Sequence, residues 1–353
     1  MPTRQIIEIS TRTILKTLLL LLGLAALYMV RDVVLILLLS VVIASAIDPG
    51  VRRLQQFRFP RPLAVLTIYI TTAAVFALIF YLLVPPLISE LRNFAVTFPT
   101  SLEDTVMQLR QNLSAYYSHA PEYLSIPAEQ VTDTLSAFIN GNLGSFFSAG
   151  SAVGSSLFGG AFSFILVVVL SFYFAVQENG IANFLKVITP LEHEGYIIGL
   201  WMRSQRKIGR WLQGQLLLGV LVGVLVYFGL TLLGVKYALL LAILAAVFEL
   251  IPIFGPILAA IPAVLLAFIQ GPILALWAVL LYILVQQMEN HLIYPLVVRK
   301  AVGVPPLLVI ISLLVGGKLA GFVGLILAVP IASAVLEYVD DVAKEKHVFE
   351  NVP

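Results

Sequence analysis

The chain contains 353 residues, of which 60% are hydrophobic and only 11% are charged, and its formal net charge is +2. About a quarter of the residues of a soluble domain are charged, so this chain must expose much of its surface to lipid rather than water. The near-neutral charge gives no indication of nucleic-acid binding. The absence of cysteine excludes disulfides, thiolate metal sites and cysteine nucleophiles. We expect an all-α membrane protein with roughly eight hydrophobic membrane segments of about 20 residues each.

Residues 1–86 predict the first three membrane helices. Apolar runs cover residues 13–30, 33–47 and 63–84. The third run is expected to end at Pro85-Pro86, because proline disrupts a helix interior. The first run follows several basic residues, as the core of a signal peptide does. A second apolar run comes almost at once, however, and we therefore interpret the first as a retained span.

Residues 87–150 form the one sizeable polar segment, which carries six acidic residues against two arginines. Its apolar residues recur at three- and four-residue spacing, which is typical of amphipathic helices. We therefore predict a small helical extracytoplasmic insertion. Because a segment of this length is marginal as an independent domain, we expect it to pack on the membrane part or on a neighbouring subunit.

Residues 151–353 form the predicted C-terminal membrane core and its cytoplasmic tail. A cation-rich segment at 177–212 contains two tryptophans and is typical of a helix at the membrane interface. In the span that follows, Gly219 and Gly223 form a GxxxG pair, which permits close packing of helices. The apolar runs of this part lie at residues 156–176, 213–233, 237–269, 272–285 and 305–338.

The basic loops predict the orientation of the chain. Cytoplasmic loops are enriched in lysine and arginine, which places the N-terminus, the loop 52–61 and the segment 186–210 in the cytoplasm. These three regions fall on one side if the first five spans each cross once. The insertion at 87–150 then lies outside, and the C-terminus is cytoplasmic.

Two later apolar runs, 237–269 and 305–338, are long for single spans and are interrupted at their middles. Each either crosses the membrane once with a kink or forms a hairpin. We favour hairpins because they put Arg299-Lys300 on the cytoplasmic side. In lipid a broken helix is tolerated only against protein or a water-filled cavity, and paired breaks indicate the binding site of a transporter. The expected hinge residues are Pro252, Gly255, Pro256, Pro295, Gly316, Gly317 and Gly321.

Polar residues gather near these breaks, inside otherwise apolar sequence. An ionised side chain at membrane depth costs several kcal/mol, so such residues usually line a polar path or pair with one another. Three interpretations are open for these residues: a substrate cluster, an ion or proton relay, or a structural ion pair. For Glu289, a position at the membrane interface is a further alternative. The candidate substrate- or ion-binding residues are Glu249, Gln286, Gln287, Glu289, Asn290 and Lys318.

Three motifs surround the breaks. They are Glu249-x-x-Pro252-x-x-Gly255-Pro256, the run Gln286-Gln287-x-Glu289-Asn290 ending at Pro295, and Gly316-Gly317-x-x-x-Gly321-x-x-Gly324 followed by Ala328-Val329-Pro330. These motifs, and the layout of three spans, an insertion and five further segments, resemble the autoinducer-2 exporter family of bacterial membrane proteins. Many relatives have histidine where Pro305 stands, so any role of that histidine is absent here.

The resemblance implies a multi-pass permease of the bacterial inner membrane that exports autoinducer-2, a small furanone-type signal of quorum sensing. Some relatives are instead described as exchanging Na⁺ or Li⁺ for H⁺. We therefore expect a secondary transporter that forms a homo-oligomer. Its expected partners are the lipid bilayer and either a small polar solute or a monovalent cation with protons.

Other functions have less support in the sequence. A channel-like oligomer needs a continuous polar stripe, and few polar residues lie outside the breaks. No GxSG nucleophile motif, HExxH zinc motif or Walker motif occurs in the chain. We therefore expect no enzyme activity, no catalytic residue, no metal and no cofactor. A membrane scaffold that acts through residues 87–150 stays open as a further alternative.

Overall fold

The computed structural model describes residues 11–117, 161–293 and 304–350. Within these ranges the chain forms helices and turns without a strand, which confirms the predicted all-α class. Residues 118–150 of the predicted insertion and the predicted hinge Pro295 lie outside these ranges. The elements are α1 (Thr11–Met29), α2 (Arg31–Gln56), α3 (Arg61–Tyr117), α5 (Ala161–Val176), α6 (Gly180–Ile188), α7 (Leu191–Leu233), α8 (Ala238–Phe248), α9 (Phe254–Gln270), α10 (Pro272–Met288), the π-helix η2 (Glu289–Ile293) and α12 (Pro306–Glu350).

Five of the described helices are long and apolar enough to cross a membrane, or six if α5 and α6, bent by 81° at their junction, form one span. The predicted number of about eight is therefore not confirmed. One reason is that α8 and α9 contain only 11 and 17 residues, whereas a span needs about 20. Large apolar side chains are exposed on most helices, and in the apolar part of α3 only 11% of residues are buried within the chain. These surfaces suit lipid rather than water.

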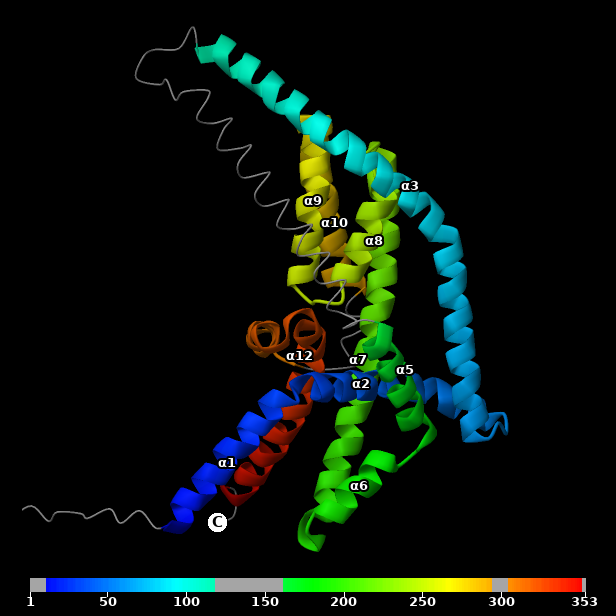
Figure 1. Cartoon of the computed structure of the whole chain (residues 1–353), viewed down its shortest axis with the longest axis vertical. Coiled ribbons are helices and arrows are strands. Elements are labelled where there is room, and N and C mark those ends of the chain that lie inside the picture. The colour runs from blue at the N-terminus through cyan, green and yellow to red at the C-terminus, as the bar shows by residue number, and fades with distance from the viewer. Residues whose placement is uncertain (1–10, 118–160, 294–303, 351–353) are drawn as a thin grey trace, which may run out of the picture.

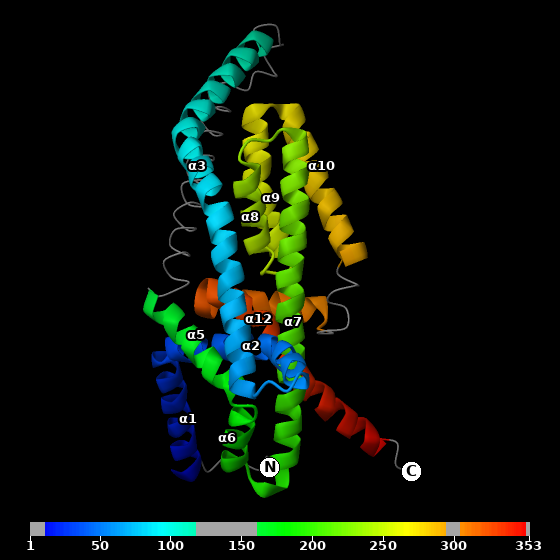
Figure 2. The same cartoon turned by 90° about the vertical axis from the view of Figure 1, so that its right-hand side faces the viewer.

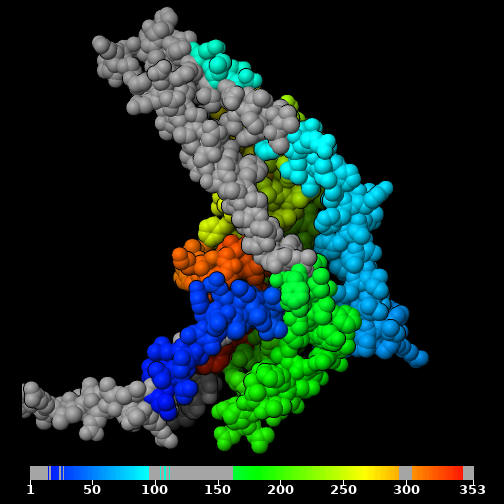
Figure 3. Space-filling view, viewed as in Figure 1, coloured from blue at the N-terminus to red at the C-terminus, as the bar shows by residue number. Residues whose placement is uncertain are grey.

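Helix α7 is the axis of the molecule (Figures 1 and 2). Helices α8, α9 and α10 stand beside its C-terminal half, while α2 and α12 cross it near the middle of its length. In the space-filling view α12 lies directly against α2 (Figure 3). The first part of the predicted basic segment 177–212 forms α6. Its last part, from Leu191, continues without a break into the predicted span, because α7 runs through 43 residues.

Helix α7 ends in a Schellman motif. Gly234 has a φ of 75°, its N–H donates to Thr231 O at 3.1 Å, and the N–H of Val235 donates to Leu230 O at 2.9 Å. Glycine adopts this left-handed conformation without steric cost. Val235 and Leu230 are both buried, as expected for the apolar contact that accompanies the motif.

Helix α3 differs from the prediction, because it does not end at Pro85-Pro86 but continues to Tyr117. A proline inside a helix removes one backbone hydrogen bond and bends the axis without necessarily ending the helix. Figure 1 shows α3 curving along its length. The third predicted span and the start of the predicted insertion are therefore one continuous helix.

The middle of α3 contacts the N-terminal end of α8. A carboxylate oxygen of Glu90 accepts the N–H of Leu240 at 2.9 Å. This N–H belongs to the first turn of α8, whose donors have no partner within the helix. Next to it, the rings of Phe94 and Tyr237 meet edge to face, with centroids 5.4 Å apart. Glu90 thus caps α8 from another helix, and a negative charge is favourable at that end.

The chain reverses direction at both predicted breaks. Helices α8 and α9 pack on one another, and a Cβ at Gly255 would lie 2.0 Å from Phe248 O. In α12 the backbone leaves helical geometry at Ala320 and Gly321. A Cβ at Gly316 would lie 2.4 Å from Gly324 O, although residues eight apart in a straight helix are separated by about 12 Å. Each broken run is therefore a hairpin rather than one kinked helix.

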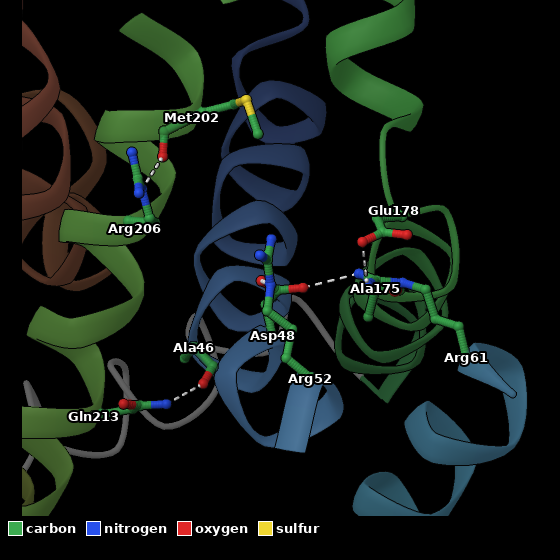
Figure 4. Close-up of polar contacts among 9 residues, drawn as sticks. All are labelled: Ala46, Asp48, Arg52, Arg61, Ala175, Glu178, Met202, Arg206 and Gln213. Atoms are coloured by element: carbon green, nitrogen blue, oxygen red, sulfur yellow. Dashed lines mark hydrogen bonds and ion pairs between the residues drawn. The ribbon is translucent and has the colours of Figure 1, made fainter. Parts of the chain in front are cut away.

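An arginine joins α2, α3 and α5 (Figure 4). Arg61 donates from Nε to Ala175 O and from Nη2 to Asp48 Oδ1, both at 2.9 Å, and its Nη1 lies 3.6 Å from Glu178 Oε1. The side chains of Arg61 and Asp48 are only 11% and 14% exposed. Ala175 lies in the last turn of α5, where carbonyls have no partner within the helix and a cation is favourable. Arg61 therefore donates hydrogen bonds both to a free carbonyl at the end of α5 and to the carboxylate of Asp48 in α2.

We predict that Arg61→Ala lowers the free energy of unfolding by about 3 kcal/mol, because the largely buried Asp48 keeps only the exposed Arg52 as a partner and Ala175 O loses its donor. The matched control is Arg31→Ala. Arg31 pairs with Asp32 at 3.7 Å, but the two side chains are 49% and 86% exposed, so this change should cost less than about 1 kcal/mol. Thermal unfolding of both variants in the same detergent tests the prediction. Equal losses of stability would mean that the Arg61 contacts contribute little.

Candidate functional site

Two acidic side chains meet at the inner end of the α8–α9 hairpin. Glu249 follows directly on α8 and is 2% exposed, and Glu289 begins η2 and is 7% exposed. The two carboxyl groups, which we call the carboxyl pair, lie close enough to interact with one another. The structure thus brings together two residues that the sequence predicts as site residues on separate elements.

The carboxyl pair can hold a proton. Two buried carboxyl groups side by side repel one another when both are ionised, so the arrangement favours a proton on one of them. The second carboxylate oxygen of Glu249 is buried and has no hydrogen-bond partner. A buried acceptor without a partner is costly. This oxygen is therefore open to a proton, a cation or a donor group of a solute.

Three amide side chains surround the pair. Gln215 of α7 is 2% exposed and donates from Nε2 to the backbone oxygen of Glu249. Gln286 of α10 donates from Nε2 to Glu289 Oε2 at 3.2 Å and to Asn290 Oδ1 at 3.4 Å. The predicted residues Gln286 and Asn290 therefore lie beside the carboxyl pair. Gln215 was not among the predicted site residues, and the only signal for it is a polar residue inside an apolar run.

Helix α7 packs closely against α8 through a face of small residues. Gln215, Gly219 and Gly223 recur every four residues and therefore share one face of α7. A Cβ at Gly219 would lie 2.8 Å from Ala246 O, and a Cβ at Gly223 would lie 2.9 Å from Ala246 Cβ. The predicted close packing at the GxxxG pair is thus between α7 and α8. This approach brings Gln215 within reach of the carbonyl that the end of α8 leaves free.

The turn between α8 and α9 is strained. Ile253 has a φ of 71° and a ψ of −53°, and the N–H of Phe254 donates to Pro252 O at 2.8 Å. This is the geometry of a γ-turn, a rare conformation and an unfavourable one for a β-branched residue. Strain of this kind persists only where the surroundings hold it, and it is common at functional sites. Pro252, a predicted hinge, therefore lies at the strained tip of the hairpin.

The two hairpins touch through an apolar contact. Ile251 is 2% exposed and packs against Leu313 and Ala328, one from each arm of α12. The predicted hinge residue Gly316 and the motif residue Gly324 bring these arms together, as described above. Because Ile251 is two residues from Glu249, the apolar contact lies next to the carboxyl pair.

Two predicted residues do not join the site. Gln287 is exposed, and its carbonyl contacts the ring Nδ1 of His291 at 3.1 Å. Lys318 is exposed on the first arm of α12. Among the described residues, the ion pairs of α12 join Glu337 and Asp341, on its C-terminal arm, to α7. The other predicted hinge residues, Gly255, Pro256, Gly317 and Gly321, lie in the turns or arms of the hairpins.

The chemistry of the site is that of neighbouring carboxyl and amide groups. In the part of the chain that the structure describes, no three His, Asp or Glu side chains converge as a metal site requires. Carboxylate and amide oxygens suit protons and monovalent cations, and amide groups also bind hydroxyl groups by donating and accepting hydrogen bonds.

Comparison with known proteins identifies relatives over most of the chain. The family model described as AI-2E family transporter matches residues 17–344. Putative transport protein YueF of Bacillus subtilis (strain 168) is 28% identical over 311 residues, which are 85% of this chain and 81% of that protein. Putative transport protein YrrI of the same organism is 26% identical over 87% of this chain and 86% of its own length. Putative permease PerM of Escherichia coli (strain K12) is 25% identical over 48% of this chain and 49% of its own length.

The close approach of α7 and α8 generates a prediction. Gly219→Ala should destabilise the protein by about 1 to 3 kcal/mol, because the new methyl group meets the backbone oxygen of Ala246 and forces the helices apart. Gly195→Ala on the same helix is the control, since a Cβ there would have no atom within 4 Å. That change should be neutral or stabilising by roughly 0.5 to 1 kcal/mol. Thermal unfolding that ranks the two variants in the opposite order would contradict the geometry.

Proposed function

Because the chain belongs to the AI-2E family of transporters, we propose that it is a secondary transporter that moves a small polar solute across the bacterial inner membrane. In this proposal the carboxyl pair of Glu249 and Glu289 lies on the transport route and takes up and releases a proton in each cycle. The observation that carries the proposal is the buried oxygen of Glu249 that lacks a partner beside a second buried carboxyl group. Ionisable residues are rarely placed in membrane segments without such a function.

The neighbouring amides suggest how a solute is held. Gln286 and Asn290 offer donors and acceptors next to the pair, and such groups recognise the hydroxyl groups of a small polyol. Autoinducer-2 is a solute of this kind, and its export is the finer function that we propose. The helix ends at the break add partial charges that favour a polar occupant.

A second candidate is exchange of Na⁺ or Li⁺ for H⁺. It is favoured by the same buried oxygen of Glu249, because a monovalent cation binds there once the proton leaves. In this alternative the carboxyl pair is the substrate site itself. The two candidates differ in what accompanies the proton, and not in the residues that bind it.

The proposal includes the predicted orientation. The termini and the loop that joins α2 to α3 face the cytoplasm, and residues 87–150 are extracytoplasmic. A homo-oligomer remains a prediction from the sequence. Ile251 then closes the route between the two hairpins, because its apolar contact with α12 excludes water when the hairpins are together.

We predict that Glu249→Gln abolishes transport without loss of folded protein, because glutamine keeps the size of the side chain but does not release a proton. The measurement uses purified protein in liposomes that contain a pH dye, with imposed Na⁺, Li⁺ and K⁺ gradients and, separately, labelled autoinducer-2. The matched control is Glu192→Gln in the exposed first turn of α7, which should transport normally. Cation-dependent proton flux that disappears in the variant would favour the exchanger. Transport that survives Glu249→Gln would remove the carboxyl pair from the mechanism.

The apolar contact generates a separate prediction. Ile251→Gly should increase passive leakage of the transported solute from loaded liposomes, because the contact between the hairpins becomes open to water. Ile251→Leu should keep leakage low, since it conserves the apolar volume. A folded glycine variant that is as tight as the native protein would show that Ile251 does not close the route.

A further inference from the structure

The connection between α2 and α3 presents arginine and phenylalanine side chains to its surroundings. We call residues 52–59 the arginine turn. Arg52, Arg53 and Arg58 are all exposed, and Phe57 and Phe59 are 76% and 44% exposed. Exposed aromatic rings beside arginines are not a feature of an ordinary soluble loop, and they require an explanation.

The position of the arginine turn places it at the membrane surface. It comprises the last residues of α2 and the connection to α3. Helix α2 and the first 34 residues of α3 are each long and apolar enough to cross a membrane. A short connection between two spans lies where the hydrocarbon ends and the lipid headgroups begin. At this level aromatic rings and cationic side chains find favourable surroundings.

The charges of the arginine turn are not balanced by the protein. No acidic residue occurs between Asp48 and Glu90 in the sequence. Asp48 is already engaged, because it accepts from Arg52 Nε at 2.7 Å and from Arg61 Nη2 at 2.9 Å (Figure 4). Within the described ranges neither Arg53 nor Arg58 forms an ion pair. Two guanidinium groups therefore remain available for an anion from outside the protein.

The backbone at Arg58 adds an independent observation. Arg58 has a φ of 66°, and its N–H donates to Gln55 O at 2.9 Å as the chain leaves α2. This left-handed position after a helix is usually occupied by glycine, because other residues adopt it at a cost in backbone energy. An arginine in the place of glycine is therefore disadvantageous for the backbone. We therefore look for the reason for an arginine at this position in its side chain.

We propose that the arginine turn binds the phosphate-containing headgroup of an anionic phospholipid. The guanidinium groups of Arg53 and Arg58 form charge-assisted hydrogen bonds with the phosphate oxygens, which match the planar fork of arginine. The rings of Phe57 and Phe59 lie against the glycerol and the upper part of the acyl chains. A lipid fits better than a free phosphate ion, because a free ion makes no use of two exposed rings.

The experiment compares Arg58→Gly with the native protein. Purified full-length protein in detergent is titrated with fluorescent phosphatidylglycerol and, separately, with fluorescent phosphatidylcholine. Arg58→Gly should weaken the binding of phosphatidylglycerol about fivefold, the effect expected for one basic residue near an anionic lipid surface. The thermal stability of the variant should be equal or higher, because glycine removes the backbone strain. The loss of binding therefore cannot result from misfolding.

The matched control is Arg31→Gln, which removes an exposed arginine from the connection between α1 and α2. It should leave the binding of phosphatidylglycerol unchanged. Three results would overturn the proposal: unchanged binding in Arg58→Gly, an equal loss in Arg31→Gln, or equal binding of phosphatidylcholine by the native protein. Displacement of the lipid by millimolar inorganic phosphate would assign the site to free phosphate instead, and would overturn the choice of a lipid.

Discussion

Lipid offers no hydrogen bonds, so every backbone group that a broken helix leaves free must find its partner within the protein. The α8–α9 hairpin meets this requirement locally. The backbone oxygen of Glu249 accepts from Gln215, and Ile251 O accepts the N–H of Gly255 at 2.8 Å. A break of this kind is stable only where other helices surround it. The buried position of Glu249 is a consequence, since the residue that ends α8 is enclosed together with the end itself.

Small residues make this enclosure possible. The glycine face of α7 lets α8 approach until their backbones nearly touch, and Gly316 and Gly324 do the same for the arms of α12. Helices so close together leave no room for large side chains between them. The amide of Gln215 and the carboxyl group of Glu249 lie at the end of the contact between α7 and α8. The same packing that satisfies the backbone therefore also concentrates polar side chains at one point. A polar site within an apolar bundle follows from the way the helices are broken.

Much of this could be predicted from the sequence, because the cost of charge in lipid is a strong and local rule. Glu249 and Glu289 interrupt apolar runs, and the rule selects both. The same rule also selects Lys318, which is exposed on the α12 hairpin. The rule does not say which face of a segment packs against other helices. Gln215 was missed since its partner is a backbone oxygen 34 residues away, and no local pattern indicates such a contact. The continuation of α3 beyond Pro85-Pro86 was missed because proline bends some helices and ends others, depending on what packs beside them.

The continuity of α3 has a mechanical consequence. The helix is anchored to α2 and α5 at Arg61 and touches the start of α8 at Glu90 and Phe94. A helix rises about 1.5 Å per residue, so roughly 44 Å of curved helix separates Arg61 from Glu90. This length exceeds the hydrocarbon thickness of about 30 Å, and a rod longer than the bilayer must tilt or bend to fit within it. A thicker or thinner bilayer therefore changes the tilt or the bend of α3, and this change reaches α8 through Glu90 and Phe94. The thickness of the membrane thus acts as a mechanical load on the segment that holds Glu249.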